Sequence, residues 1–318
     1  KYSEDMNMLE NSYIITGPTA SGKTNLAIKL AQHLKSEIIC MDSMTLFKDM
    51  DIGTAKPTQD EQAIVKHHMV DILKPTEPSS VQFWLKSAKE IAWELIAKGK
   101  SPIFVGGTPL YLKALMMGLF EIPEIPKHIR SELEEQFPQT DFAEAYRMLE
   151  EIDADSAKKI HSNDRRRIIR ALEVWKSLGI TISSLQKQWE ITTNSTFNPD
   201  KIRCIWLQMP RHKLHERIHN RTKLLLKKGW VDEVKRLRKK YPVLSKEASQ
   251  AIGYSQIAQF LEGLINIEKM EDAINLATRQ LAKKQETWFR HLPACIPISL
   301  ENNFRFWGFD IDIQLDNH

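Results

Sequence analysis

The residues at 17–24 have the types and spacing of a phosphate-binding loop. This octapeptide, GPTASGKT, matches G-x-x-x-x-G-K-[ST] at every fixed position, with an apolar run before it and an amphipathic pattern after it. Such loops close backbone N–H groups around phosphate oxygens, and the following helix adds partial positive charge. Lys23 would neutralise the terminal phosphates, and Thr24 would hold a Mg²⁺ ion. We therefore predict a polyphosphate or pyrophosphate site formed by Gly17, Pro18, Thr19, Ala20, Ser21, Gly22, Lys23 and Thr24.

An aspartate and a threonine follow two further apolar runs. Asp42 comes directly after EIICM at 37–41, and Thr108 follows PIFV at 102–105 and two glycines. In an open α/β sheet the carboxyl ends of the strands border the ligand crevice, so both side chains should face the loop. Asp42 could act as a general base, support Mg²⁺ indirectly or only cap a turn or helix. Thr108 could be a site residue or the cap of the next helix.

The elements that carry these residues alternate between strand and helix. Apolar runs at 12–16, 37–41 and 102–105 predict strands, and 69–73 is a further candidate. Helical periodicity over 26–34 and 83–97 fills the intervals. Strands that alternate with helices indicate βαβ units and a parallel sheet. The predicted fold class is therefore α/β, with a P-loop NTPase-like core whose parallel sheet is flanked by helices.

The pattern changes in the middle of the chain. A proline-containing segment at 121–129 reads as a linker, 129–188 is almost wholly helical in pattern, and NSTFNP at 194–199 reads as a second linker. Strand-like runs then return at 201–208 and 295–299, with basic amphipathic helices between them. We predict the first part of a catalytic core over 1–124, an all-helical insertion domain over 125–198, and the second part of the core over 199–318.

Composition excludes several classes of protein. Of 318 residues, 42% are hydrophobic and 27% are charged, which is typical of a folded globular chain. No apolar run reaches the roughly 18 residues of a membrane-spanning helix, so we expect no membrane partner. Cys40, Cys204 and Cys295 stand far apart without CxxC spacing. They indicate a reducing compartment, here the cytoplasm, and argue against a disulfide framework or a cysteine zinc site.

Basic residues are concentrated although the net charge is only +4. Residues 201–240 contain 14 Lys and Arg against three acids, and residues 158–170 contain six against one. Such clusters suit an RNA phosphate backbone, although a basic run by itself is more often a solvated helix face. From the charge pattern alone, RNA binding and a solvated helix face both remain open.

Eight sequence blocks together resemble one family, the tRNA dimethylallyltransferases, also called isopentenyl-adenosine tRNA transferases. The blocks run in family order across nearly the whole chain. They are GPTASGKT at 17–24, DSM at 42–44, MDIGTAKP at 50–57, HHMVDI at 67–72, GGTPLY at 106–111, NDRRRIIRALEV at 163–174, AIGY at 251–254 and TRQLAKKQETWFR at 278–290. With only three cysteines, the chain lacks the zinc-finger extension of eukaryotic relatives and resembles the bacterial type.

The resemblance implies a reaction and the roles of several residues. Members transfer a dimethylallyl group from dimethylallyl pyrophosphate to the exocyclic 6-amino nitrogen of the adenosine 3′-adjacent to the anticodon. Asp42 would then be the general base, Thr108 would contact the pyrophosphate or the reaction centre, and Lys23 with a Thr24-held Mg²⁺ would stabilise the departing pyrophosphate. The nucleic-acid partner would be the anticodon stem-loop of tRNA rather than DNA. Because one channel serves one tRNA, we expect a monomer.

The same resemblance assigns residues to tRNA binding. Arg217 and Arg221 would line the channel of the flipped base. The remaining residues lie in four segments: Asp42, Ser43, Met44 and Thr45; Arg130; Arg166, Arg167, Ile168, Ile169 and Arg170; and Gln250, Gly253 and Tyr254.

Two departures and three rival functions remain. Members usually carry Gln where this chain has Thr45 and Tyr where it has Phe47, so the range of accepted anticodon loops is open. The rivals are a prenyltransferase that acts on free AMP or ADP, a small-molecule kinase that uses the loop with ATP, and a non-catalytic RNA-binding P-loop protein.

Overall fold

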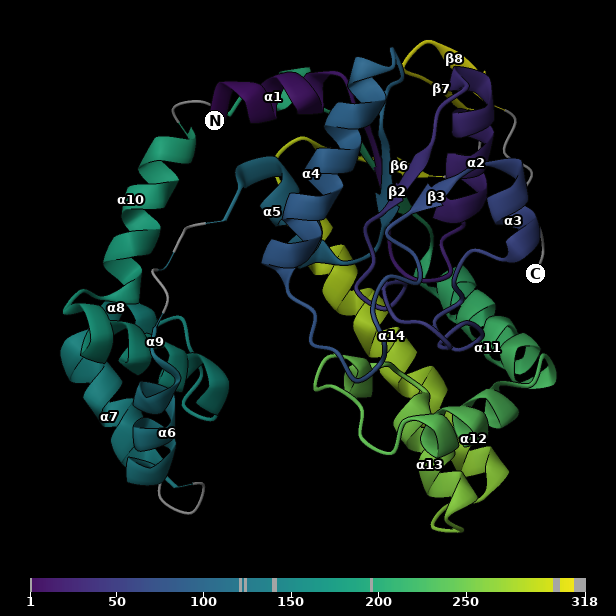
Figure 1. Ribbon diagram of the computed structural model, residues 1–318. Coiled ribbons are helices and arrows are strands. Elements are labelled where there is room, and N and C mark those ends of the chain that lie inside the picture. The colour runs from purple at the N-terminus through teal and green to yellow at the C-terminus, as the bar shows by residue number, and fades with distance from the viewer. Residues whose placement is uncertain are drawn as a thin grey trace. The chain divides into compact units, whose positions relative to one another are not determined.

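A computed structural model describes residues 2–119, 122, 125–138, 142–194, 197–299 and 304–311. The chain forms two compact units (Figure 1). One unit contains Lys1–Met116 together with Asn198–His318, and the other contains Met117–Phe197. The helical segment is therefore inserted into the sequence of the larger unit. Pro123 of the first predicted linker lies outside the described residues.

The larger unit is built around a parallel sheet, which confirms the predicted α/β class. Among the described residues the sheet has six strands in the order β3-β2-β4-β1-β5-β6, and every neighbouring pair is parallel. The strands are β1 (Tyr13–Thr16), β2 (Ile38–Cys40), β3 (His67–His68), β4 (Ile103–Gly106), β5 (Arg203–Gln208) and β6 (Cys295–Ser299). Strands β1, β2 and β4 are buried along their whole length. Their near-continuous apolar sequences are those expected of a sheet covered on both faces.

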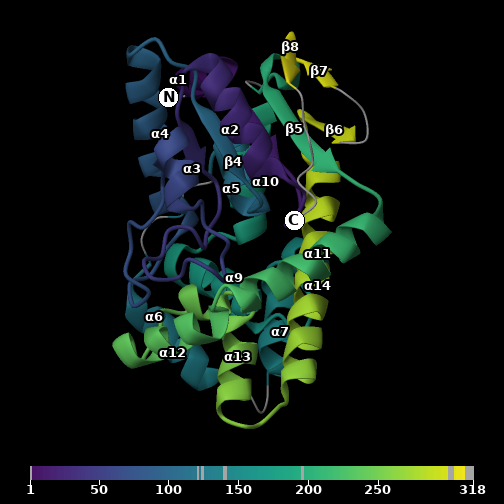
Figure 2. The ribbon, with the colours of Figure 1, turned by 90° about the vertical axis from the view of Figure 1, so that its right-hand side faces the viewer.

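Helices from both parts of the chain complete the larger unit. The first part contributes α1 (Tyr2–Glu10), α2 (Lys23–Leu34), α3 (Gln59–Ile64), α4 (Val81–Ala97) and α5 (Pro109–Met117). The second part contributes α11 (Arg211–Lys227), α12 (Trp230–Lys240), α13 (Tyr254–Leu261) and α14 (Ile267–His291), with the antiparallel pair β7 (Phe304–Phe306) and β8 (Phe309–Ile311). Helix α14 runs from the sheet, beside β6, to α12 and α13 (Figures 1 and 2).

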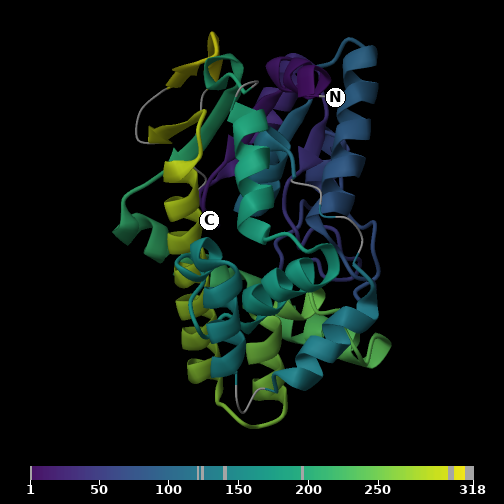
Figure 3. The same ribbon diagram turned by 90° about the vertical axis from the view of Figure 1, so that its left-hand side faces the viewer.

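The smaller unit has its own apolar core. Its helices are α6 (Lys127–Gln136), α7 (Ala143–Ile152), α8 (Ala154–Ala157), α9 (Arg165–Leu178) and α10 (Ile182–Asn194), drawn in teal in Figures 1 and 3. Leu133, Phe137, Leu149 and Leu172 are buried together between them. Asp153 joins two of the helices, because its carboxylate accepts hydrogen bonds from the backbone N–H groups of Ser156 and Ser183.

Three features differ from the sequence-based predictions. The candidate strand at 69–73 is wrong: the strand is His67–His68, and positive φ angles at Met69 (62°) and Asp71 (56°) end the extended conformation. Residues 2–10 form a helix whose Met8 is fully buried. Cys204 and Cys295, distant in sequence, occupy paired positions on β5 and β6 with their Sγ atoms 3.2 Å apart, and both remain free thiols.

Candidate active site

The predicted loop and the ends of two strands meet at one cavity. The cavity has a volume of about 380 Å³ and opens at the carboxyl edge of the sheet. Its lining includes residues of the phosphate-binding loop, of the turn after β2 and of the turn after β4. The sequence-predicted residues among them are Thr19, Lys23, Thr24, Asp42, Ser43, Met44, Thr45, Thr108, Arg221 and Gln250. Tertiary folding therefore brings together side chains from five segments.

The loop at 17–24 has the local geometry of an anion cradle. Gly22 takes a left-handed conformation with φ 90°, which turns the chain into α2 without a side-chain cap. Lys23 Nζ donates a hydrogen bond to the Pro18 carbonyl oxygen over 3.2 Å. Burial, with a smaller contribution from Arg221, lowers the pKa of Lys23 to about 8, although Asp42 opposes the shift. Burial disfavours the protonated form of this lysine in the free protein, and an anion bound beside it would stabilise that form.

Asp42 and Thr108 lie on neighbouring turns that are joined by a hydrogen bond. The Ser43 backbone N–H donates to Thr108 Oγ1 over 3.0 Å, and Met44 N–H donates to Asp42 Oδ1 over 2.9 Å. One carboxylate oxygen of Asp42 thus fixes its own turn. Asp42 faces the cavity and acts electrostatically on Lys23 and Arg221. The arrangement places a carboxylate beside the loop that carries Lys23.

Two arginines of α11 lie near the loop at 17–24, and of the two only Arg221 lines the cavity. Arg217 Nε donates a hydrogen bond to the Ala20 carbonyl oxygen of the loop over 2.8 Å. Arg221 lines the cavity, and burial lowers its pKa while Asp42 opposes the shift. The family resemblance predicts that these arginines line a channel for the target base. The structure adds a direct contact between Arg217 and the phosphate-binding loop.

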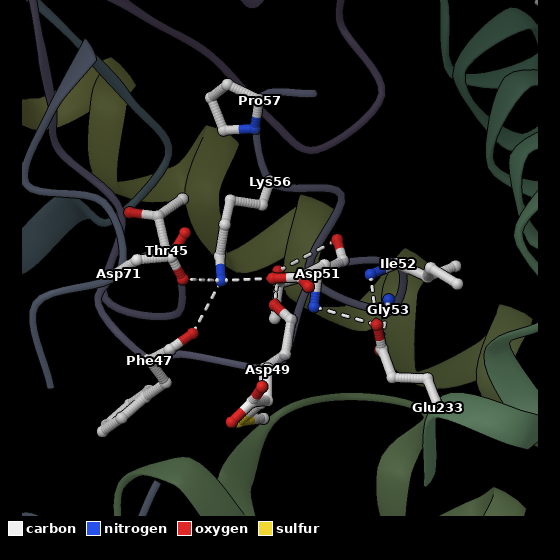
Figure 4. Close-up of polar contacts among 12 residues, drawn as sticks. Thr45, Phe47, Asp49, Asp51, Ile52, Gly53, Lys56, Pro57, Asp71 and Glu233 are labelled. Carbon is white, nitrogen blue, oxygen red and sulfur yellow. Dashed lines mark hydrogen bonds and ion pairs between the residues drawn. The ribbon is translucent and has the colours of Figure 1, made fainter. Parts of the chain in front are cut away.

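The loop at 47–57, which lies between β2 and α3, is held by the buried carboxylate of Glu233 on α12 (Figure 4). Glu233 accepts hydrogen bonds from the backbone N–H groups of Asp51 (2.9 Å), Ile52 (2.7 Å) and Gly53 (3.1 Å). The Tyr254 hydroxyl donates to the same carboxylate over 2.7 Å. Sequence reasoning missed Glu233, although its place on the apolar face between Trp230 and Leu237 was a usable signal.

A buried lysine holds the same loop from within. Lys56 Nζ donates to the Phe47 carbonyl oxygen, to Asp51 Oδ1 (both 2.7 Å) and to Asp71 Oδ1 (2.5 Å), as Figure 4 shows. A buried ammonium is tolerated only when it is paired in this way. Residues 47–57 are therefore a rigid wall, from which Gly53, Thr54, Ala55 and Pro57 line the cavity.

The structure separates the RNA-contact candidates of the larger unit into two groups. Gln250 is exposed and lines the cavity, whereas Tyr254 is only 4% exposed and its hydroxyl donates a hydrogen bond to Glu233. Gly253 is buried against the Trp230 ring. Thr45 is also buried, and its hydroxyl donates to the backbone oxygens of Asp42 (3.0 Å) and Met69 (3.3 Å). Gly253, Tyr254 and Thr45 thus serve packing and backbone support in this structure.

The smaller unit presents arginines but not isoleucines. Arg166 and Arg167 are exposed on α9, whereas Ile168 and Ile169 are buried in the core of the unit. The helical periodicity turns these two isoleucine side chains into the core, and their assignment to tRNA binding stays a prediction. Arg130 Nη1 and Arg170 Nη1 lie 3.6 and 3.2 Å from the carboxylate of the buried Glu173.

The oxygen donors at the cavity suit a magnesium ion bound with phosphates. The Thr24 hydroxyl and the Asp42 carboxylate line the same space, and Mg²⁺ is usually bound through one or two such oxygens plus substrate phosphates. Among the residues that the structure describes, no cluster of three or more His, Cys, Asp or Glu forms an all-protein metal site. None of the described helices is long and apolar enough to cross a membrane.

Comparison with known proteins identifies the family. The model of the IPP transferase family matches residues 45–292, and an isopentenyl transferase model matches residues 10–71. The tRNA dimethylallyltransferase of Francisella tularensis is 41% identical over 293 residues, which cover 91% of this chain and 94% of the relative.

Two solved structures agree. The tRNA isopentenylpyrophosphate transferase of Bacillus halodurans superposes with a TM-score of 0.64 at 33% identity, covering 90% of this chain and 89% of the other. A eukaryotic dimethylallyltransferase that acts on tRNA superposes with a TM-score of 0.74 at 26% identity, covering 91% of this chain and 73% of the other. This chain belongs to the tRNA dimethylallyltransferase (IPP transferase) family.

Proposed function

We propose that this protein transfers a dimethylallyl group from dimethylallyl pyrophosphate to the exocyclic 6-amino group of the tRNA adenosine 3′-adjacent to the anticodon. The observation that carries the proposal is the juxtaposition, at one cavity, of the Lys23 phosphate-binding loop and the Asp42 carboxylate. This pairing provides for a pyrophosphate leaving group on one side and a nucleophile that must lose a proton on the other.

The phosphate-binding loop would stabilise the leaving group. Negative charge on the pyrophosphate grows as the allylic carbon–oxygen bond breaks. Lys23, Arg221 and the N-terminus of α2 place positive charge at that position before the reaction begins. A Mg²⁺ ion held by the Thr24 hydroxyl, when bound, supplies further positive charge for the pyrophosphate oxygens.

Asp42 would act on the nucleophile. The adenine amine is a weak nucleophile because its lone pair is delocalised into the ring. A carboxylate that accepts a hydrogen bond from this N–H orients the amine and takes the proton as the new C–N bond forms. One oxygen of Asp42 is already held by the Met44 N–H, so the other is left to contact the substrate.

The acceptor would be the anticodon stem-loop of tRNA. An adenosine stacked in a loop reaches a cavity only after it is flipped out, and single-stranded loops are recognised through such splayed bases. The exposed Arg166 and Arg167 of the helical insertion and the basic face of α11 and α12 supply charge for the RNA backbone. We propose a monomer that acts in the cytoplasm, because one cavity serves one RNA.

One incubation matrix tests the proposal against its rivals. The protein is mixed with Mg²⁺, with dimethylallyl pyrophosphate or ATP as donor, and with unmodified tRNA, AMP or no acceptor. We expect prenylated adenosine only with tRNA and the prenyl donor, detected by mass spectrometry of the nucleosides. Transfer to AMP but not to tRNA would establish the free-nucleotide rival, phosphate transfer from ATP the kinase, and tRNA binding without any transfer the non-catalytic protein.

A further inference from the structure

One buried glutamine of the C-terminal part bridges two loops of the cavity. Gln285 lies on α14 and is 5% exposed. Its Oε1 accepts a hydrogen bond from the backbone N–H of Thr19 over 2.9 Å, and its Nε2 donates to the Gly107 carbonyl oxygen over 2.6 Å. Thr19 belongs to the phosphate-binding loop and Gly107 to the turn after β4. A single amide therefore joins two loops that lie far from it in sequence.

The bridge continues to the proposed general base. Gly107 precedes Thr108, whose Oγ1 accepts the hydrogen bond of the Ser43 N–H, and Ser43 follows Asp42. The fit at Gly107 is close, because a Cβ atom there would lie only 2.6 Å from Gln285 Nε2. Hydrogen bonds and short stretches of backbone thus connect the leaving-group site to the Asp42 turn through this one side chain.

Helix α14 gives the glutamine a rigid support. Near the N-terminus of the helix, Met270 and Ile274 are buried in one apolar cluster with Trp230 and Tyr254. Near its C-terminus, Phe289 is fully buried and its ring lies 6.1 Å from that of Trp206. Gln285 projects from a helix that is packed at both ends, so its amide can fix the position of the loops it contacts.

From this geometry we propose that Gln285 is a positioning residue, which holds the phosphate-binding loop and the Gly106–Thr108 turn at the separation that prenyl transfer requires. The inference rests on the proposed function. Displacement needs the leaving group, the allylic carbon and the amine in line, and a misplacement of about 1 Å can cost on the order of 10²-fold in rate. Gln285 touches no reacting atom in this scheme and acts through Thr19 and Thr108.

The test compares two substitutions with a matched control. Gln285→Met keeps the length and removes both hydrogen bonds, whereas Gln285→Glu keeps the acceptor for Thr19 and removes the donor for Gly107. Gln280→Met, at an exposed position of the same helix, is the control. Single-turnover prenyl transfer at saturating substrates, the KM for dimethylallyl pyrophosphate, the Kd for tRNA and the thermal midpoint are measured for each.

We expect the single-turnover rate to fall by roughly 10–100-fold in both Gln285 variants, with KM and the tRNA Kd changed by less than about threefold and the control unchanged. A glutamine that only stabilises the fold would lower the thermal midpoint and leave the rate of the folded protein intact. Rates within about threefold of the wild type in both folded variants would overturn the inference.

Two further outcomes are informative. If the Gln285 variants do not fold, Gly107→Ala replaces them, because the added Cβ would lie 2.6 Å from Gln285 Nε2 and displace the amide while Gln285 remains. The same Cβ would lie 3.2 Å from the Gly17 carbonyl oxygen and 3.5 Å from Lys23 Nζ, so the KM for dimethylallyl pyrophosphate is measured alongside the rate. A reduced rate with an unchanged KM supports the inference, whereas an unchanged rate, or a loss confined to KM, contradicts it. A wild-type protein that transfers no prenyl group to tRNA overturns the proposed function together with this inference. An active wild type with unaffected variants overturns the inference alone.

Discussion

Lys23 is the residue at which the electrostatics of the cavity are most evident. Within the loop its Nζ donates to the Pro18 carbonyl oxygen, Arg221 adds a second positive charge, and Asp42 opposes the effect of burial and of Arg221 on the pKa of Lys23. The pKa near 8 means that the free protein loses this charge within the range of ordinary assays. An anion that binds beside Lys23 stabilises the protonated form and raises its pKa again.

This shift predicts a pH dependence of pyrophosphate binding. Because the lowered pKa lets Lys23 lose its proton as pH rises through about 8, affinity should fall above that pH by up to about tenfold per pH unit. Lys23→Arg stays charged and should lack this component, and the ionisation of the ligand is common to both proteins. Isothermal titration of pyrophosphate between pH 7 and 9.5 measures the difference. Parallel pH profiles for the two proteins would show that Lys23 does not titrate there.

Asp42 gives the second prediction at this scale. Asp42→Asn keeps an oxygen for the Met44 N–H but cannot accept a proton, so single-turnover prenyl transfer should fall by about 10²–10⁴-fold. The Kd for tRNA should remain within about threefold, and Asp60→Asn, an exposed substitution on α3, should transfer at the wild-type rate. Rapid-quench measurement of prenylated nucleoside decides it. A wild-type rate in Asp42→Asn would remove Asp42 from the mechanism.

Among the elements, the loop at 47–57 is unusual in resting on buried charges. Lys56 joins the Asp51 carboxylate of the loop to that of Asp71, and Glu233 anchors the loop to α12 through three successive backbone N–H groups. A helix satisfies its backbone groups internally and a strand bonds to its neighbours in the sheet, but a loop that forms a cavity wall needs such side-chain partners. The two charges replace the hydrogen-bond ladder that this segment lacks.

Removing the negative anchor should destabilise the protein. Glu233→Gln replaces one acceptor oxygen with an NH₂ group that faces backbone donors, so the free energy of unfolding should fall by about 1–3 kcal/mol. Asp232→Asn, exposed on the same helix, is the matched control and should change it by less than about 0.5 kcal/mol. Urea denaturation followed by circular dichroism gives both values. Equal stabilities for the two variants would mean that the loop does not depend on Glu233.

At the scale of the whole molecule, the chain forms two compact units. The cavity lies in the larger unit, and proposed RNA contacts lie on both. The smaller unit buries Ile168 and Leu172 and exposes Arg166 and Arg167 on the same helix. Its apolar core stabilises the fold of the unit, and its exposed arginines provide positive charge for the proposed contact with RNA. The larger unit holds the complete cavity.

The arginines of the smaller unit predict a salt-dependent contribution to tRNA binding. Arg166→Ala should weaken binding and reduce the slope of log Kd against log salt by about one, because one phosphate contact and its counterion release are lost. Pyrophosphate affinity should not change, and Lys86→Ala, exposed on α4, should leave the slope intact. Fluorescence anisotropy at several salt concentrations measures the slope. An unchanged slope in Arg166→Ala would separate this helix from the RNA.

The parts of the site that were predictable are those encoded locally. GPTASGKT specifies a loop because glycine, lysine and threonine act within eight neighbouring residues, and Asp42 and Thr108 were found because parallel strands end at a common edge. Glu233 and Gln285 were not found. Each contacts backbone groups about 180 or more residues away in the sequence. The periodicity of a segment indicates which of its side chains are buried, but not which distant backbone groups they contact.

The sequence by itself determined the α/β core, the glycine-rich turn at 17–24 between β1 and α2, the carboxylate at the end of β2 and, through its combined motifs, the family. The tertiary structure alone decided that Tyr254 and Thr45 turn their hydroxyls inward, that Arg217 contacts the phosphate-binding loop, and that Gln285 joins the two sides of the cavity. The physical reason is that residue types and their spacing fix local conformation and the buried face of each element. Which distant backbone group a buried polar side chain satisfies depends on packing between elements.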